Sequence, residues 1–306
     1  MTKYQGYDVT DATHKTSIHN DWKVVVAKKK PARGVTLTIG IFFDGTGNNR
    51  ENTASRLMKF NECSAARQGV NQKDAQSCED FLKEINKNSI SNGSYRGYYS
   101  NIHWLNILYH PDQVLKKDQT SAQIKTYISG IGTAAGEADS VIGMGLGTSI
   151  LDIFEGVVTK TDEAMERITQ ALSEFMGFNL SPDFCIAKIQ FDVFGFSRGA
   201  AAARHFANRV MEQDPAIARA IAKGLRGDFY DGKPSGEVRF LGLFDTVAAI
   251  GGISNFFDIN GRSNPGVKLE LRPSVAKKVF QITAMNEYRY NFSLNSIKGM
   301  WPELAL

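Results

Sequence analysis

The chain has 306 residues, of which 42% are hydrophobic and 22% charged, values that exclude a disordered chain, a collagen and a coiled coil. Its 36 basic and 32 acidic residues leave a diffuse net charge of +4, which does not indicate a nucleic-acid partner. No apolar run reaches the roughly 18 residues that a membrane-spanning helix needs, and the amino-terminal sequence lacks the apolar core of a secretory signal. We therefore expect a chain that is made in the cytoplasm.

Residues 1–34 are mostly polar and are predicted to be an amino-terminal extension to a core that spans 35–306. The core begins with a β-branched, apolar strand at 35–43, which ends in a cluster of turn-forming residues. Residues 50–100 are polar again and are predicted to be an insertion. The next strand is expected at 124–128.

A helix is expected at 162–175, where apolar residues recur every three or four positions and Asp162 can cap the start. Strands are expected at 185–194, 238–244 and 279–285. This order predicts an α/β fold, with a mostly parallel central sheet flanked by helices.

Two patterns that suggest a cofactor are weak. Gly143-Met144-Gly145-Leu146-Gly147 is GxGxG rather than the GxGxxG of dinucleotide-binding loops, and a flexible loop near the site is the better interpretation. The three cysteines form no CxxC pair and have no histidines at metal-binding spacing. The sequence therefore predicts neither a cofactor nor a metal.

The segment that indicates chemistry is Gly195-Phe196-Ser197-Arg198-Gly199, which satisfies G-x-S-x-G. It follows an apolar strand and precedes an alanine-rich segment of high helix propensity, which is the setting of a nucleophile elbow. Ser197 is the predicted nucleophile. The Arg198 N–H and the amino terminus of the following helix are placed to stabilise an oxyanion.

A nucleophilic serine needs a base and an acid that orients it, and hydrolases of this class supply them in the order Ser, Asp or Glu, His. Asp245 directly follows the apolar strand at 238–244, so it is the predicted acid. Glu287, after the strand at 279–285, is the reserve acid.

Three segments together resemble the α/β hydrolases that include the first family of type VI secretion lipase effectors. They are Phe42-Phe43-Asp44-Gly45-Thr46-Gly47-Asn48, the segment from Gly195 to Ala200, and Leu241-Gly242-Leu243-Phe244-Asp245-Thr246-Val247. The resemblance continues through 127–133 and 284–289. It implies that Ser197 is the nucleophile, that Asp245 is the acid, and that the Asp44-Gly45-Thr46 loop lies near the oxyanion pocket.

The resemblance also implies phospholipase activity against membrane glycerophospholipids and delivery, without a signal peptide, into the periplasm of a target bacterium. Its expected partners are a secretion spike protein, an immunity protein and the phospholipid membrane. Because the periplasm is oxidising, Cys63 and Cys78 of the insertion are candidates for a disulfide. Cys185, in a predicted core strand, is expected to be a buried free thiol.

This sequence departs from the family in one respect, since no histidine follows His205. The family's catalytic histidine lies after a strand that would begin near Trp301, so the chain alone is expected to be catalytically deficient. His205 itself is predicted to pack or hydrogen-bond under the elbow, while His103 and His110 precede the serine. Two alternatives stay open: a hydrolase of the same fold that acts on a soluble ester, and a non-catalytic binding module.

Overall fold

A five-stranded, all-parallel sheet forms the centre of the protein in the computed structural model, as the α/β prediction requires. The strand order is β2-β1-β3-β4-β5, so β3 is the central strand, with β1 and β4 on either side of it. The structure describes residues 33–67, 76–81, 83, 93–139, 150–179, 184–225, 232–247, 267–286, 294 and 296–297. The bounds of the strands are β1 Arg33–Phe43, β2 Ser121–Ile128, β3 Phe184–Phe196, β4 Glu237–Phe244 and β5 Lys278–Ile282.

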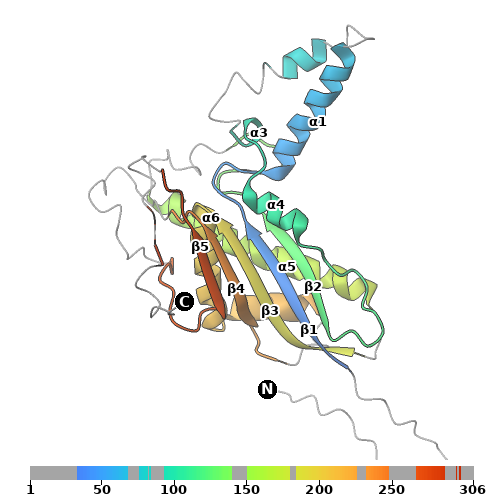
Figure 1. The fold of residues 1–306 in the computed structure, drawn as a ribbon, viewed down its shortest axis with the longest axis vertical. Coiled ribbons are helices and arrows are strands. Elements are labelled where there is room, and N and C mark those ends of the chain that lie inside the picture. Colours follow the sequence, from blue (N-terminus) through green and yellow to red (C-terminus); the bar gives the residue numbers. More distant parts are fainter. Residues whose placement is uncertain are drawn as a thin grey trace, which may run out of the picture.

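Helices cover both faces of this sheet (Figure 1). One face carries α5, α6 and α7, of which α6 contacts β1, β3 and β4, and the other face carries α4. The bounds are α1 Arg50–Arg67, α3 Gly93–Arg96, α4 Asn101–Leu108, α5 Ile150–Phe178, α6 Arg198–Met211 and α7 Pro215–Gly224. Among the described residues, no helix is both long and apolar enough to cross a bilayer.

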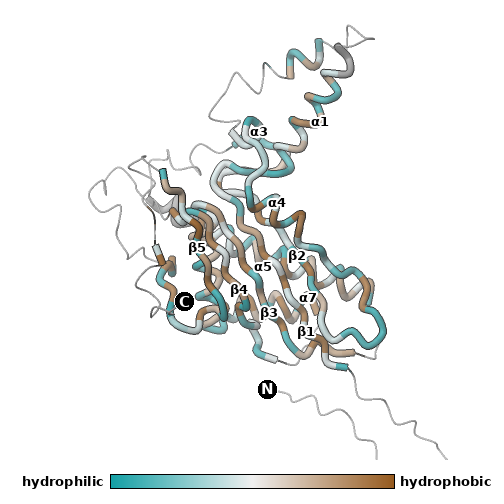
Figure 2. The backbone as a smooth tube through the Cα atoms, viewed as in Figure 1, coloured by the Kyte–Doolittle hydropathy of each residue, from teal (hydrophilic) through white to brown (hydrophobic). Residues whose placement is uncertain are grey.

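Alternation along β1 divides the core between the two faces, because successive side chains of a strand point in opposite directions. Leu37, Ile39, Ile41 and Phe43 are buried against the α5–α6 face, where the larger hydrophobic cluster lies. Phe42 points the other way, into a smaller cluster with Ile102 and Tyr127 under α4. The sheet is accordingly mostly apolar along its strands (Figure 2).

The described parts of the predicted insertion are largely helical and extend from the carboxyl end of the sheet (Figure 1). Its first helix, α1, packs mainly against α3. Cys63 and Cys78 form a disulfide with their Cα atoms 5.4 Å apart, which confirms the predicted bridge. The disulfide ties α1 to the second helical segment of the insertion at 76–81.

Three local predictions are wrong. Cys185 is half-buried rather than buried, because it lies near the start of β3, opposite Gly34 at the margin of the sheet. Asp162 does not cap a helix, since α5 begins at Ile150 and Asp162 lies within it. The last strand ends at Ile282, and Met285 beyond it is 93% exposed. The extension to residue 32 and the Gly143–Gly147 loop lie outside the described residues.

Candidate active site

The carboxyl ends of β1, β3 and β4 bring the three sequence motifs together. Each strand is followed by one residue whose backbone N–H still donates to the last residue of a neighbouring strand: Asp44 to the Ile128 carbonyl at 2.9 Å, Ser197 to Phe244 at 2.9 Å, and Asp245 to Ile282 at 2.7 Å. Because β1, β3 and β4 are consecutive in the sheet, Ser197 lies between Asp44 and Asp245 along the carboxyl ends of these strands. Adjacent strands are about 4.8 Å apart, so the three backbones are close neighbours.

Ser197 forms the sharp turn that the sequence predicts for its position. It is the residue between β3 and α6, with φ 55° and ψ −123°, a strained conformation for a residue with a side chain. Its side chain makes no capping hydrogen bond to α6, and the residue is only half-buried. The hydroxyl is therefore held at the amino terminus of a helix without being used to cap it.

The glycines on either side of Ser197 are required by space. A Cβ on Gly195 would lie 2.4 Å from the carbonyl oxygen of Gly199. One on Gly199 would lie 2.3 Å from the carbonyl oxygen of Asp44 and 2.5 Å from that of Phe43. These contacts are with backbone atoms, so the first turn of α6 needs glycine at 195 to fold back against the end of β3, and glycine at 199 to lie against the end of β1.

Asp44 is buried, and its carboxylate is held by three hydrogen bonds. The Tyr127 hydroxyl donates to Oδ2 at 2.6 Å, the Ser100 hydroxyl donates to Oδ2 at 2.9 Å, and the Gly45 N–H donates to Oδ1 at 2.7 Å. Burial raises the pKa of Asp44, and these three hydrogen bonds oppose that rise. Its carboxylate thus fixes the loop after β1 to β2 and to the amino terminus of α4.

The residues that follow Asp44 in the loop after β1, and the residue that follows Ser197, have different surroundings. Gly45 packs against the ring of Phe196, since an added Cβ would lie 2.4 Å from that ring. The Thr46 hydroxyl is buried and has no hydrogen-bond partner among the described residues. Arg198, the residue after the serine, is buried, and burial lowers its pKa to about 10, so it remains charged at neutral pH.

Asp245 is half-buried and also has a positive φ, 46°. Its Oδ1 accepts a hydrogen bond from the Ala284 N–H at 3.3 Å, which links it to the segment after β5. The next residue, Thr246, is fully buried and accepts a hydrogen bond from Gln281 at 3.3 Å. Glu287, the reserve acid, lies outside the described residues.

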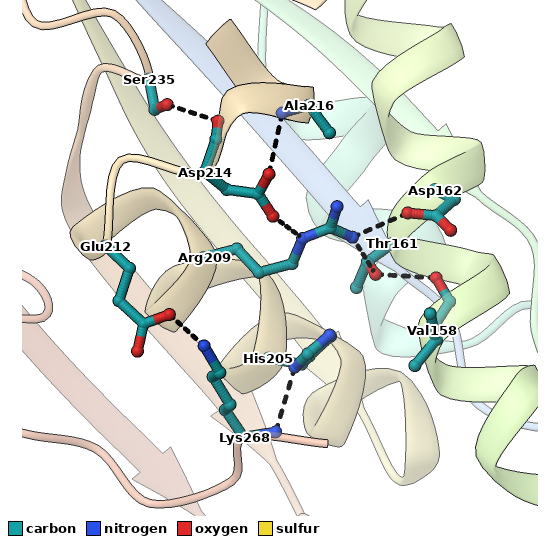
Figure 3. A network of polar contacts seen from close by, with 10 residues as sticks. All are labelled: Val158, Thr161, Asp162, His205, Arg209, Glu212, Asp214, Ala216, Ser235 and Lys268. Atoms are coloured by element: carbon teal, nitrogen blue, oxygen red, sulfur yellow. Dashed lines mark hydrogen bonds and ion pairs between the residues drawn. The ribbon is translucent and has the colours of Figure 1, made fainter. Parts of the chain in front are cut away.

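His205 lies on α6, where its described hydrogen bond is to Lys268 and not to Ser197. Its Nδ1 accepts a hydrogen bond from the Lys268 N–H at 3.0 Å, which confirms the expected hydrogen-bonding role (Figure 3). Burial, together with the nearby charges of Arg209 and Lys268, lowers the pKa of His205 to about 4. In the same region Arg209 donates to Asp162 at 2.7 Å and to Asp214 at 2.6 Å, which ties α6 to α5 and α7 (Figure 3).

The remaining described histidines are His103 and His110. His103 lies in α4 and stacks on Tyr99 with ring centroids 3.9 Å apart, and burial lowers its pKa. His110 is exposed just after the helix. No hydrogen bond joins either of them to Ser197 in the part of the chain that the structure describes. The same part contains no cluster of three or more acidic, histidine or cysteine side chains that could hold a metal.

Sequence reasoning missed Tyr127 and Ser100, which hold Asp44. Tyr127 is the penultimate residue of β2, where it resembles any aromatic residue of a strand, and Ser100 resembles an ordinary helix cap. Nothing in the spacing of 44, 100 and 127 indicates that they meet. The pairing of β2 with β1 is what brings them together.

No protein-family model and no curated protein matches the chain. Among solved structures, "Structure of the Tle1 effector bound to the VgrG spike from the Type 6 secretion system" contains a chain with 94% sequence identity and a TM-score of 0.66. The match covers 99% of the present chain and 55% of the other, so this chain spans about half of its length. A crystal structure of an uncharacterized protein from Pseudomonas aeruginosa matches with 16% identity over 87% of this chain and 38% of the other, but its TM-score of 0.31 carries no argument.

The identity with the Tle1 effector extends across the three motifs that meet at the sheet edge, since it covers nearly the whole chain. The chain belongs to the Tle1 family of type VI secretion effectors.

Proposed function

We propose that the protein is a serine esterase that hydrolyses membrane glycerophospholipids, with Ser197 as nucleophile and Asp245 as the acid of its triad. The observation that carries the proposal is the strained turn at Ser197, between the ends of β1 and β4. A nucleophile elbow requires a serine at positive φ, with a glycine two residues before it and another two residues after it where the backbone leaves no room for a Cβ. Ser197, Gly195 and Gly199 meet these requirements.

The proposed chemistry begins with attack of Ser197 Oγ on the ester carbonyl carbon, as a base takes the hydroxyl proton. The oxygen that becomes negatively charged is stabilised by the Arg198 N–H at the start of α6 and by the loop at Asp44-Gly45-Thr46. The ester C–O bond then breaks, and the alcohol leaves with the proton that the base had taken, which gives the acyl-enzyme. Water hydrolyses the acyl-enzyme, which releases the fatty acid and regenerates the serine hydroxyl.

Asp245 would hold the base in the correct orientation. It follows the strand next to β3, so its backbone is one strand spacing from that of Ser197. The base is the part of this triad that the described residues do not supply, since His205, on α6, accepts a hydrogen bond from the Lys268 N–H instead. Without a base the serine hydroxyl is a poor nucleophile, and activity is expected to fall by several orders of magnitude.

The family supports a role for the protein as an antibacterial effector of a type VI secretion system. The related Tle1 effector was solved bound to the VgrG spike, and we propose that the present protein also docks to a spike protein of this kind. A phospholipase of this kind would act from the periplasm of the target cell, and a specific immunity protein would protect the producing cell. The disulfide between Cys63 and Cys78 is consistent with that oxidising compartment.

The test is hydrolysis of phospholipid vesicles by the complete protein, followed as released fatty acid. Ser197→Ala is expected to reduce the rate at least about 1,000-fold, and Asp245→Asn by a comparable or smaller factor. Ser121→Ala, an exposed serine at the start of β2, is the matched control and is expected to keep full activity.

A soluble short-chain ester separates the alternatives. Ser197-dependent hydrolysis of that ester, with none of the vesicles, would indicate a soluble-ester hydrolase of the same fold. Hydrolysis of neither substrate by the wild-type protein would favour a non-catalytic binding module and would contradict the proposal.

A further inference from the structure

A partly open cavity of about 200 Å³ lies beside the edge strand β2, apart from the serine. It is built where α4 and α5, which cover opposite faces of the sheet, both reach the edge of β2 (Figure 1). Polar atoms contribute most of its lining. The residues that matter for its chemistry are Arg50, Asn106, Lys125, Arg167, Gln170 and Glu174.

The cavity concentrates positive charge. Arg50 at the start of α1, Lys125 in β2 and Arg167 in α5 line it, against the single carboxylate of Glu174. Elsewhere the protein carries only a small excess of basic over acidic residues, so three cations around one cavity depart from the average. The three come from separate elements and are brought together by the fold.

The hydrogen bonds of these cations leave the charge only partly balanced. Arg50 donates to Glu51 at 2.7 Å and to the Asn106 side chain at 2.8 Å. The Lys125 ammonium donates to the Asn106 backbone carbonyl, and among the described residues it has no carboxylate partner. Burial and the nearby Arg50 charge lower the pKa of Lys125, which is the effect expected of a cation held in a partly desolvated, positive environment.

Arg167 contributes a cation from the opposite side. Its one carboxylate partner in the described part of the chain is Glu163, at 3.7 Å, and its side chain is 51% exposed. A guanidinium with so loose a pairing can turn to a ligand in the cavity. The Gln170 amide, which donates to Glu174 at 2.8 Å, adds a neutral donor beside it.

We propose that this cavity binds a phosphate group. Two guanidinium groups and one ammonium match the several oxygens and the charge of −1 to −2 that a phosphate ester or inorganic phosphate carries, because guanidinium donors pair with phosphate oxygens in parallel. A ligand with a single carboxylate group, by comparison, would balance fewer of the three cations. The volume exceeds that of one phosphate group, so there is room for the group that a phosphate ester carries.

The site is linked to the loop beside the serine. The Arg50 guanidinium lies 4.2 Å from the centre of the Tyr127 ring, and the Arg50 backbone N–H donates to the Tyr127 hydroxyl at 3.2 Å. That hydroxyl in turn donates to Asp44. Strand β2 is two places from β3 in the sheet, so the site lies about 10 Å across the sheet from the strand that carries Ser197.

Two sources share this chemistry, a free phosphate and the headgroup of a phospholipid. The first measurement is calorimetric titration of the full chain with inorganic phosphate at low, constant ionic strength, since salt screens such contacts. We expect millimolar or tighter binding, weakened about tenfold by Lys125→Gln and by Arg167→Gln. Lys278→Gln, an exposed lysine of β5 at the opposite edge of the sheet from β2, is the matched control and is expected to bind as the wild type does.

The second measurement is sedimentation with vesicles of phosphatidylglycerol, using the same variants. Weaker vesicle binding by both cavity variants but not by the control assigns the site to a lipid headgroup, while an effect on inorganic phosphate alone assigns it to a free phosphate. Arg167→Gln changes an exposed side chain, so it tests the site even if Lys125→Gln disturbs folding. No phosphate binding by the wild type, or equal binding by the wild type and both cavity variants, overturns the proposal.

Discussion

Ser197 and Asp245 occupy equivalent positions on two neighbouring parallel strands. Each follows a residue of the pair Phe196 and Phe244, which face each other in the β3–β4 register, and each has a positive φ, 55° and 46° respectively. Both strands thus end in an unfavourable turn at the same level of the sheet. Such conformations cost about 1–3 kcal/mol each, a strain that the proposed roles of Ser197 and Asp245 would account for.

Ser197→Gly is expected to be more stable than Ser197→Ala by about 1 kcal/mol, since glycine adopts positive φ without a Cβ penalty. Both variants lack the hydroxyl and are expected to be inactive. The free energy of unfolding from urea titration measures the difference. Equal stabilities would show that the backbone at Ser197 relaxes easily, which would contradict the strain.

Gly199→Ala is expected to destabilise the protein by about 2 kcal/mol or more, because the new methyl group would meet the backbone carbonyl oxygens of Phe43 and Asp44 at 2.5 and 2.3 Å. Gly177→Ala, in α5, is the matched control, since an added Cβ there meets nothing within 4 Å. The melting temperatures of the two variants provide the comparison. A Gly199→Ala protein as stable as the Gly177→Ala protein would refute the close approach of α6 to β1.

Tyr127→Phe is expected to cost about 1–3 kcal/mol of stability, because it removes the hydrogen bond at 2.6 Å to the buried Asp44 carboxylate. The pKa of Asp44 would rise further, since that hydrogen bond favours the charged form. Chemical denaturation checks the stability, with Tyr98→Phe, at an exposed tyrosine, as the control. Similar losses in the two variants would show that Tyr127 does not hold the loop.

Stability is expected to fall as the pH drops from about 6.5 to about 4, partly through His205. Its pKa in the folded protein is about 4, below the ordinary value of 6.5, so the unfolded chain binds the proton first in this window. The full effect is at most about 3 kcal/mol. His205→Asn keeps an acceptor for the Lys268 N–H without titrating, and its stability is expected to depend less on pH across this range. Parallel pH profiles for both proteins would rule His205 out as the cause.

Replacing both Cys63 and Cys78 by serine is expected to loosen the insertion and leave the sheet intact, because α1 packs mainly against α3 and the bridge closes a loop of 15 residues. Hydrogen exchange should accelerate at 50–67 and stay unchanged at 184–196. Faster exchange in β3 as well would indicate that the insertion contributes to the stability of the whole fold.

The sequence alone determined the elements whose signals are local. The apolar strand before Ser197, the glycines on either side of it and the helix-forming run after it lie within about twenty residues, so the turn could be predicted from their order. The bridge of Cys63 and Cys78 joins two residues of the same short insertion. The apolar strands ending at Phe43 and Phe244 were recognisable for the same reason.

Only the tertiary structure decided what depends on strand order. Asp44 meets Tyr127 because β2 pairs with β1, and Arg50, Lys125 and Arg167 surround one cavity because α1, β2 and α5 meet at that edge. Asp162 looked like a helix cap in the sequence, yet α5 begins earlier and Asp162 pairs with Arg209 of α6. Side chains 42 to 117 residues apart in the chain carry no local pattern, since their contact is set by the packing of whole elements rather than by the spacing of residues.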